Sequence, residues 1–150
     1  MLTFILPILR ELGLAFVATL GFGLLFNVPR RALLACGLTG AIGRAVRLIA
    51  QGMGADVVGG TFVGAVAVAL VGYLLARLYR VPRTLFTITG VIPMVPGVPA
   101  FSTMLQFAAG DIQQGINSAV QTALITGALA MGLTTVRALS HTPPEAEGGD

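Results

Sequence analysis

The sequence predicts an all-α, polytopic membrane helix bundle of about five transmembrane helices, the fourth of them broken. Of the 150 residues, 55% are hydrophobic and only 10% are charged, whereas soluble domains carry roughly 25% charged residues. Apolar runs of about 20 residues, the length needed to cross a bilayer, recur as far as residue 139. Residues 140–150 are rich in Pro, Glu and Gly, which is typical of disorder. We therefore expect a transmembrane domain over residues 1–139 and a disordered cytoplasmic tail over residues 140–150.

Short polar or basic segments separate the apolar runs. The first span follows an apolar lead-in that ends with Arg10 and Glu11, which we expect at the membrane interface, and Pro29 closes the turn after it. Asp56 and Asp111 precede the third and fifth spans, where a carboxylate favours a helix N-terminus. The spans are expected over residues 12–26, 32–50, 57–76, 84–109 and 115–136.

The fourth span carries three prolines spaced by three, Pro93, Pro96 and Pro99, together with Gly97. Each proline lacks an N–H and clashes with the carbonyl one turn back, and Gly97 can adopt a positive φ. Such a break leaves backbone groups unpaired, which is tolerated at membrane depth only inside protein or beside a wet cavity. Many transporters build a substrate site at such a break. The alternative is a kink satisfied by neighbouring helices.

Arginine placement predicts the orientation. All nine basic residues are arginine, and five passes put six of them on one side. Because basic loops are cytoplasmic, we expect the N-terminus outside and the C-terminus in the cytoplasm. A hairpin in the fourth span would put Arg137 outside, and residues 84–92 are too short to cross alone. The six are Arg30, Arg31, Arg77, Arg80, Arg83 and Arg137.

Two further arginines, Arg44 and Arg47, lie inside the second span, one turn apart and on one face. An arginine within the membrane is costly and is a candidate functional residue. A carboxylate is its natural partner, because the guanidinium group binds it in a bidentate manner. The alternative is that Arg47 reaches the outer headgroups from the end of its helix.

The second half of the broken span is expected to begin near Pro99. Its first amides, at Ala100, Phe101 and Ser102, would then carry a positive dipole end that favours an anion. Gln106 would add a polar side chain, and a polar stripe on the fifth span either bonds to another helix or lines a path. The substrate-site candidates are Arg44, Arg47, Pro93, Pro96, Gly97, Pro99, Ala100, Phe101, Ser102 and Gln106, with Asn117 and Gln121 as polar-path candidates.

Other functional classes lack support. The sequence has no paired-carboxylate site, no Cys/His cluster and no phosphate loop, so we expect neither an enzyme nor a metal or cofactor. The net charge of +3 reflects loop arginines rather than a nucleic-acid surface. Small residues at helical spacing, such as Gly60 and Gly64, indicate close helix packing. Five short spans make a small bundle, which suggests a second subunit or a second copy.

Several segments resemble the threonine/serine exporter family, specifically its small subunit, which corresponds to the C-terminal half of the fused exporter. The segments are residues 27–33, 40–43, 80–86 and 90–97, followed by Gly110 and Asp111. The most specific of them is the P-x-x-P-G core at Pro93, Pro96 and Gly97. The resemblance covers about residues 12–139.

This resemblance implies a two-component exporter in the inner membrane, whose partner is a larger membrane subunit of the same family. It implies efflux of threonine/serine-type small carboxylate metabolites, driven by an ion gradient. Two alternatives stay open. The subunit could serve dicarboxylate export, such as that of succinate, or it could be a non-transporting membrane assembly subunit.

Overall fold

The structure, a computed structural model, describes residues 2–139, with side chains from residue 6 onward. Every element in this part of the chain is helical, which confirms the expected fold class. The expected tail, residues 140–150, lies outside the described residues. The elements are α1 (Leu2–Leu25), α2 (Arg30–Gly52), α3 (Val57–Tyr79), α4 (Arg83–Val91), the 3-10 turn η1 (Ile92–Met94), α5 (Gly97–Ala108) and α6 (Ile112–Leu139).

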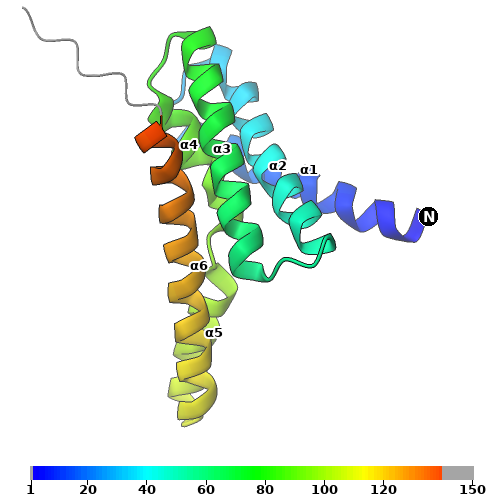
Figure 1. Ribbon diagram of the computed structural model, residues 1–150, viewed down its shortest axis with the longest axis vertical. Helices are drawn as coiled ribbons and strands as arrows, with labels where there is room; N and C mark the ends of the chain where they lie inside the picture. The colour runs from blue at the N-terminus through cyan, green and yellow to red at the C-terminus, as the bar shows by residue number, and fades with distance from the viewer. Residues whose placement is uncertain (1, 140–150) are drawn as a thin grey trace, which may run out of the picture.

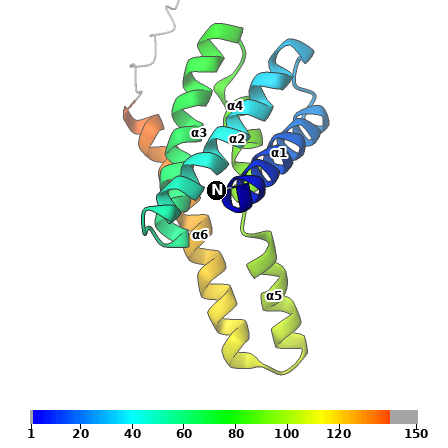
Figure 2. The same ribbon diagram turned by 90° about the vertical axis from the view of Figure 1, so that its right-hand side faces the viewer.

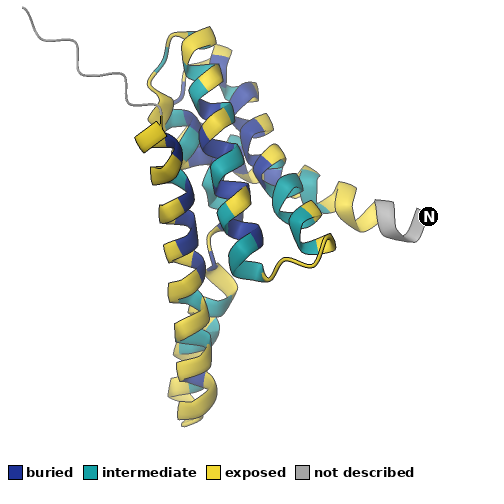
Figure 3. Cartoon of the chain, viewed as in Figure 1, coloured by how far each residue is buried: buried dark blue, intermediate teal, exposed yellow. Residues whose placement is uncertain are grey.

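Helices α2 and α3 form the centre of the molecule (Figures 1 and 2). Helix α1 packs against α2 with its C-terminal half, while its N-terminal half diverges from the bundle. Helix α4 packs against α2 and α3. The second half of α6 packs along α3, and its first half extends beyond α3 and pairs with α5. Helix α5 and the first half of α6 thus form an arm. Buried residues gather on the α2, α3 and α6 surfaces that face one another, and the arm is largely exposed (Figure 3).

Glycines allow the central helices to approach closely. A Cβ at Gly64 would lie 2.9 Å from the Gly43 carbonyl oxygen, and a Cβ at Gly132 would lie 2.7 Å from the Phe62 carbonyl oxygen. Neither contact is possible for a larger residue without moving backbone. The small-residue spacings in the sequence therefore do mark helix–helix packing, as expected.

Among the described side chains, four threonines are completely buried between the helices. Each hydroxyl donates to a carbonyl oxygen one turn back, as Thr39 does to Ala35 at 2.8 Å and Thr89 does to Leu85 at 2.6 Å. This local bond satisfies the polar group without a partner helix, and it allows threonine to pack as a small apolar residue would.

In the described part of the chain, four helices are long and apolar enough to cross a membrane, and the bent pair Arg83–Met94 and Gly97–Ala108, with an angle of 50° at the break, makes a fifth if the pair is one span. The two expected carboxylate caps are present. Asp56 accepts from the Gly59 N–H at 2.8 Å, and Asp111 accepts from the Gln114 N–H at 3.1 Å. The apolar lead-in is not separate from the first span, because α1 starts at Leu2 and contains Pro7.

Candidate functional site

The break between α4 and α5 is a compact turn. The Val95 N–H donates to the Ile92 carbonyl at 3.1 Å, and the Gly97 N–H donates to the Val95 carbonyl at 2.8 Å. The Met94 side chain is fully buried and fills a notch that two glycines leave between α2 and α3. Its Cε and Sδ lie 3.1 Å and 2.8 Å from where a Cβ of Gly43 and of Gly64 would be. Met94 thus anchors the break in the centre of the bundle.

One expectation for this turn, that the amide of Ala100 is free, is wrong. Helix α5 begins at Gly97 rather than near Pro99, and the Ala100 N–H already donates to the Pro96 carbonyl at 3.1 Å. The amides at Ala100, Phe101 and Ser102 are therefore not the exposed first turn of a helix. Gly97 has no positive φ, unlike Gly54 and Gly110 among the described glycines. Its permissive backbone is not what allows the chain to turn here.

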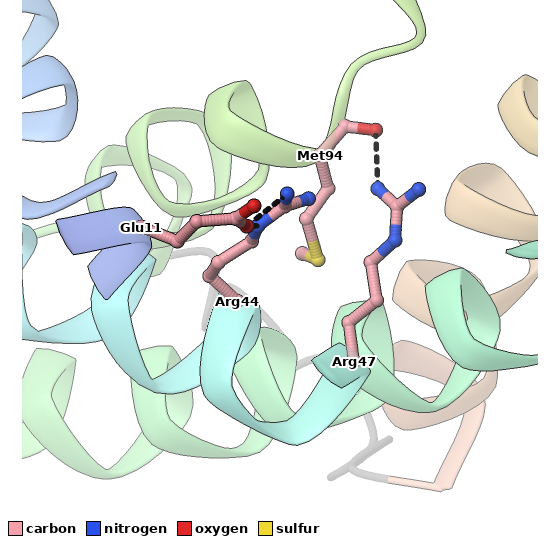
Figure 4. A network of polar contacts seen from close by, with 4 residues as sticks. All are labelled: Glu11, Arg44, Arg47 and Met94. Atoms are coloured by element: carbon pink, nitrogen blue, oxygen red, sulfur yellow. Dashed lines mark hydrogen bonds and ion pairs between the residues drawn. The ribbon is translucent and has the colours of Figure 1, made fainter. Parts of the chain in front are cut away.

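Arg47 is directed at the break from α2 (Figure 4). Its Nη1 donates to the Met94 carbonyl oxygen at 3.4 Å. Its Nε is buried and has no hydrogen-bond partner among the described residues. The side chain therefore points into the bundle rather than along α2 to the headgroups. A buried donor of this kind calls for a polar partner such as water or a bound group.

Arg44 forms an ion pair with Glu11 of α1 (Figure 4). Its Nε donates to Glu11 Oε2 at 2.9 Å, and its Nη2 contacts the same oxygen. The Arg44 side chain is 23% exposed and that of Glu11 is 43% exposed. Charge-assisted contacts of this kind are stronger than neutral hydrogen bonds. The pair therefore joins α1 to α2 at a point where a lone charge would be costly.

A pocket of about 350 Å³ opens beside this ion pair, between α1, α2 and η1. Glu11, Arg44 and Pro93 contribute to its wall, and Leu14, Ala15 and Ala18 provide an apolar side. The volume falls in the range of small-molecule sites. The pocket therefore brings together one of the predicted arginines, its carboxylate partner and the first proline of the break.

Glu11 was not among the expected site residues. The sequence places it beside Arg10 at a membrane interface, whereas the structure pairs it with Arg44, which is 33 residues away. The sequence shows only that three small residues, Ala15, Thr19 and Gly23, continue from Glu11 at four-residue spacing, and the structure adds that all three are buried. This spacing defines one face of a helix. Glu11 is therefore the first residue of the α1 face that packs on α2.

The candidates from Phe101 onward lie on α5 and α6. Helix α5 packs mainly against α6. The side-chain amide of Gln106 is hydrogen-bonded to Ser118 Oγ of α6 at 2.7 Å. When the amide nitrogen faces Ser118, it also donates to the Ser102 carbonyl at 3.3 Å. Phe101, Asn117 and Gln121 are exposed. The polar groups on α5 and α6 thus hold the arm together in this structure, and they do not line the Glu11–Arg44 pocket.

A comparison with known protein families identifies the family of the chain. Residues 11–139 match the family described as Threonine/Serine exporter, ThrE. No solved structure matches the chain. The matched region includes Glu11, both intramembrane arginines and the whole of the broken span. The chain therefore belongs to the threonine/serine exporter family of membrane transporters.

Proposed function

We propose that this chain is the small subunit of a two-component inner-membrane exporter of small carboxylate metabolites, and that the pocket beside Glu11, Arg44 and Pro93 binds the substrate carboxylate. One observation carries the proposal. Arg44 already holds a carboxylate, that of Glu11, on the wall of a pocket next to the broken span. A site that accommodates one carboxylate on a guanidinium group is chemically suited to exchange it for another.

Exchange keeps the charges paired throughout. An unpaired charge at this depth costs several kcal/mol, whereas a paired one costs much less. When the pocket is empty, Arg44 is paired with Glu11. When a substrate carboxylate binds Arg44, Glu11 is released and needs a new cation. An α-amino acid supplies that cation with its ammonium group, so the ion pair as a whole is complementary to a zwitterion.

The same geometry separates the two candidate substrate classes. A threonine- or serine-like zwitterion would place its carboxylate on Arg44 and its ammonium group on Glu11. A dicarboxylate would be repelled by Glu11, and its second carboxylate would need Arg47, whose Nε is unpaired among the described residues. We favour the zwitterion, because Glu11 is part of the pocket wall and Arg47 is not.

The open sides of the bundle support a partner subunit. Helix α5, all of which is described, has no buried residue, and most residues of the apolar stretch of α1 are exposed or half-buried. A larger subunit of the same family would cover these helices. The arginine-rich ends of α2, α3 and α6 lie together in Figure 1, and we assign that end to the cytoplasm, with the N-terminus outside.

The test is transport of labelled threonine and succinate into vesicles that contain both subunits. Arg44→Gln removes a charged hydrogen bond and should lower transport about 10- to 100-fold. Arg10→Gln is the matched control, because Arg10 has the same charge and adjoins Glu11 but does not line this pocket. Equal rates in the Arg44→Gln variant and the wild type would remove the pocket from the transport path.

Glu11→Gln then distinguishes the substrates. For a zwitterion the variant loses the partner of the ammonium group, so threonine transport should fall. For a dicarboxylate it loses a repulsive charge, so succinate transport should be unchanged or faster. Threonine transport that stays intact, together with succinate transport that is unchanged or faster, would reverse our assignment of the substrate class.

A second function, that of a non-transporting assembly subunit, is favoured by one contact. Arg47 donates to the Met94 carbonyl at 3.4 Å, so part of the broken backbone is satisfied from within the bundle. A break of that kind can be purely structural. The larger subunit, reconstituted alone, should be inactive if our first proposal holds. Full activity without this chain would favour the assembly role.

A further inference from the structure

Helix α2 holds the break at two points of a single residue, Met94. The Met94 side chain lies in the notch at Gly43, and its carbonyl oxygen accepts from Arg47 Nη1 at 3.4 Å (Figure 4). Gly43 and Arg47 are four residues apart, so both contacts come from one face of α2. The residue at the centre of the break is therefore fixed through its side chain and through its backbone by the same helix.

The Met94 carbonyl depends on a donor from outside its own turn. Pro96, two residues further on, has no N–H, and the Gly97 N–H donates to the Val95 carbonyl at 2.8 Å. Two of the N–H groups that could close a turn onto the Met94 carbonyl are therefore unavailable. An unpaired carbonyl is costly at membrane depth, and Arg47 supplies the missing hydrogen bond.

This contact lies one residue away from the Glu11–Arg44 pocket. Pro93, which precedes Met94, contributes to the wall of that pocket, and so does Arg44, one turn before Arg47 on α2. Arg47 itself does not line the pocket. A planar peptide bond joins Pro93 to Met94, and a helical turn joins Arg44 to Arg47. The separation of Pro93 from Arg44 therefore depends on how α2 holds Met94.

We propose that Arg47 is a positioning residue for substrate binding. Its bond to the Met94 carbonyl sets the distance between the Pro93 wall of the pocket and the Arg44 guanidinium group. Arg47 acts through Met94 and does not touch the substrate. The inference rests on the proposed function, because it takes this pocket as the substrate site. A binding site needs its groups held to within about 0.5 Å by the residues behind them, which is the role that the geometry gives to Arg47.

The first test needs no substrate. Spin labels at positions 49 and 98, both exposed, report the distance from α2 to the start of α5 by pulsed electron–electron double resonance, in a background without Cys36. Arg47→Met removes the donor but keeps a long side chain, so it should broaden the distance distribution. Arg47→Lys keeps a charged donor and should broaden it less. Arg31→Met is the matched control, because Arg31 is an exposed arginine of the same helix and does not line the pocket.

The second test is transport of labelled threonine into vesicles that contain both subunits. Arg47→Met should raise KM about tenfold, with a smaller change in the maximal rate, and Arg47→Lys should restore part of the wild-type KM. A purely structural role would instead reduce the amount of folded transporter, which lowers the maximal rate and leaves KM unchanged. Arg47→Gln, which shortens the side chain and removes the charge, provides a second variant if Arg47→Met does not fold.

The outcomes separate this inference from the proposed function. If Arg44→Gln leaves transport unchanged, the pocket is not the substrate site, and the proposed function and this inference fail together. If Arg44→Gln lowers transport but Arg47→Met leaves either the distance distribution or the KM for threonine unchanged, the pocket stands and the positioning role is wrong. Loss of succinate transport alone in Arg47→Met would also overturn the inference, because Arg47 would then contact a second carboxylate directly.

Discussion

Gly43 and Gly64 determine whether the break can be anchored, because the Met94 side chain occupies the space that a Cβ at either position would fill. At Gly64 the nearest atoms also include the Gly43 carbonyl oxygen at 2.9 Å, which belongs to backbone and cannot rotate away. Met94 is flexible enough to adapt to one added methyl group, but α2 and α3 would still have to separate. A methyl group added at Gly64 therefore destabilises the packing of α2 against α3.

Gly64→Ala should lower the free energy of unfolding by about 1–3 kcal/mol, the usual range for overpacking. Gly97→Ala is the matched control, because a Cβ there meets nothing within 4 Å among the described atoms. Alanine is also the better helix former, so the control should be as stable as the wild type or slightly more stable. Denaturation in mixed micelles measures the free energy of unfolding of both variants. A Gly64→Ala variant as stable as the control would contradict the packing argument.

Glu11 and Arg44 should be energetically coupled as well as close. In a double-mutant cycle of Glu11→Gln and Arg44→Gln, we expect a coupling free energy of unfolding of about 1 kcal/mol. The value is modest because the Glu11 side chain is 43% exposed. The same cycle with Arg10→Gln in place of Arg44→Gln should give no coupling free energy. Additive effects in the first cycle would mean that the ion pair does not stabilise the fold.

The sequence predicted part of this site for a clear reason. Arg44 and Arg47 stand out because a charge inside an apolar span is costly and requires a polar partner, whatever the neighbouring residues are. Glu11 does not stand out, because it lies near the start of the chain beside Arg10, where a charged pair is expected at an interface. Only the α1–α2 packing, which the sequence does not specify, shows that Glu11 faces inward to Arg44.

At the scale of elements, the broken span illustrates what proline can and cannot predict. Three prolines exclude a continuous helix, and the structure has a 50° bend where they occur. They do not fix where α5 starts, because proline is tolerated throughout the first turn of a helix, where the N–H has no partner. Pro99 is the third residue of α5 rather than the first. For this reason the Ala100 amide, which was expected to be free, is bonded to the Pro96 carbonyl.

The geometry of the break should depend on the Met94 anchor as much as on the prolines. Met94→Ala removes a fully buried side chain, a change that typically costs 2–5 kcal/mol, and it should broaden the distance distribution between spin labels at positions 88 and 105. Both positions are exposed and lie on either side of the break. Met104→Ala, at a residue that is 72% exposed, is the control. Pulsed electron–electron double resonance, in a background without Cys36, measures this distance distribution. An unchanged width in Met94→Ala would mean that the prolines alone fix the bend.

For the whole molecule, the positions of the apolar helices were predictable and the arm was not. Apolar runs and arginine-rich turns identify each crossing. The exposed residues of α5 have the same apolar character whether they face lipid, a partner subunit or a core, so composition cannot place them. The arm also depends on α6 being longer than α3, with 28 residues against 23. At 1.5 Å per residue the difference amounts to about 7.5 Å.

The path of the broken span determines the topology. Helix α4 starts near the arginine-rich end, and α5 ends at the opposite end of the molecule, from which α6 returns (Figures 1 and 2). The pair should therefore cross the membrane once rather than re-enter on the same side. Single cysteines at positions 30, 53 and 113, each exposed in the structure, report on this in a background without Cys36.

In intact cells, a membrane-impermeant maleimide should label Met53→Cys and Gln113→Cys but not Arg30→Cys, which should react only after permeabilisation. This pattern follows because positions 53 and 113 lie beyond the outer ends of α2 and α5, whereas position 30 is at the arginine-rich end. Labelling of positions 30 and 113 from the same side would mean a re-entrant pair, and α6 would then have to end outside. Labelling of position 30 alone would keep the single crossing and invert the orientation, so the two parts of the topology are tested separately.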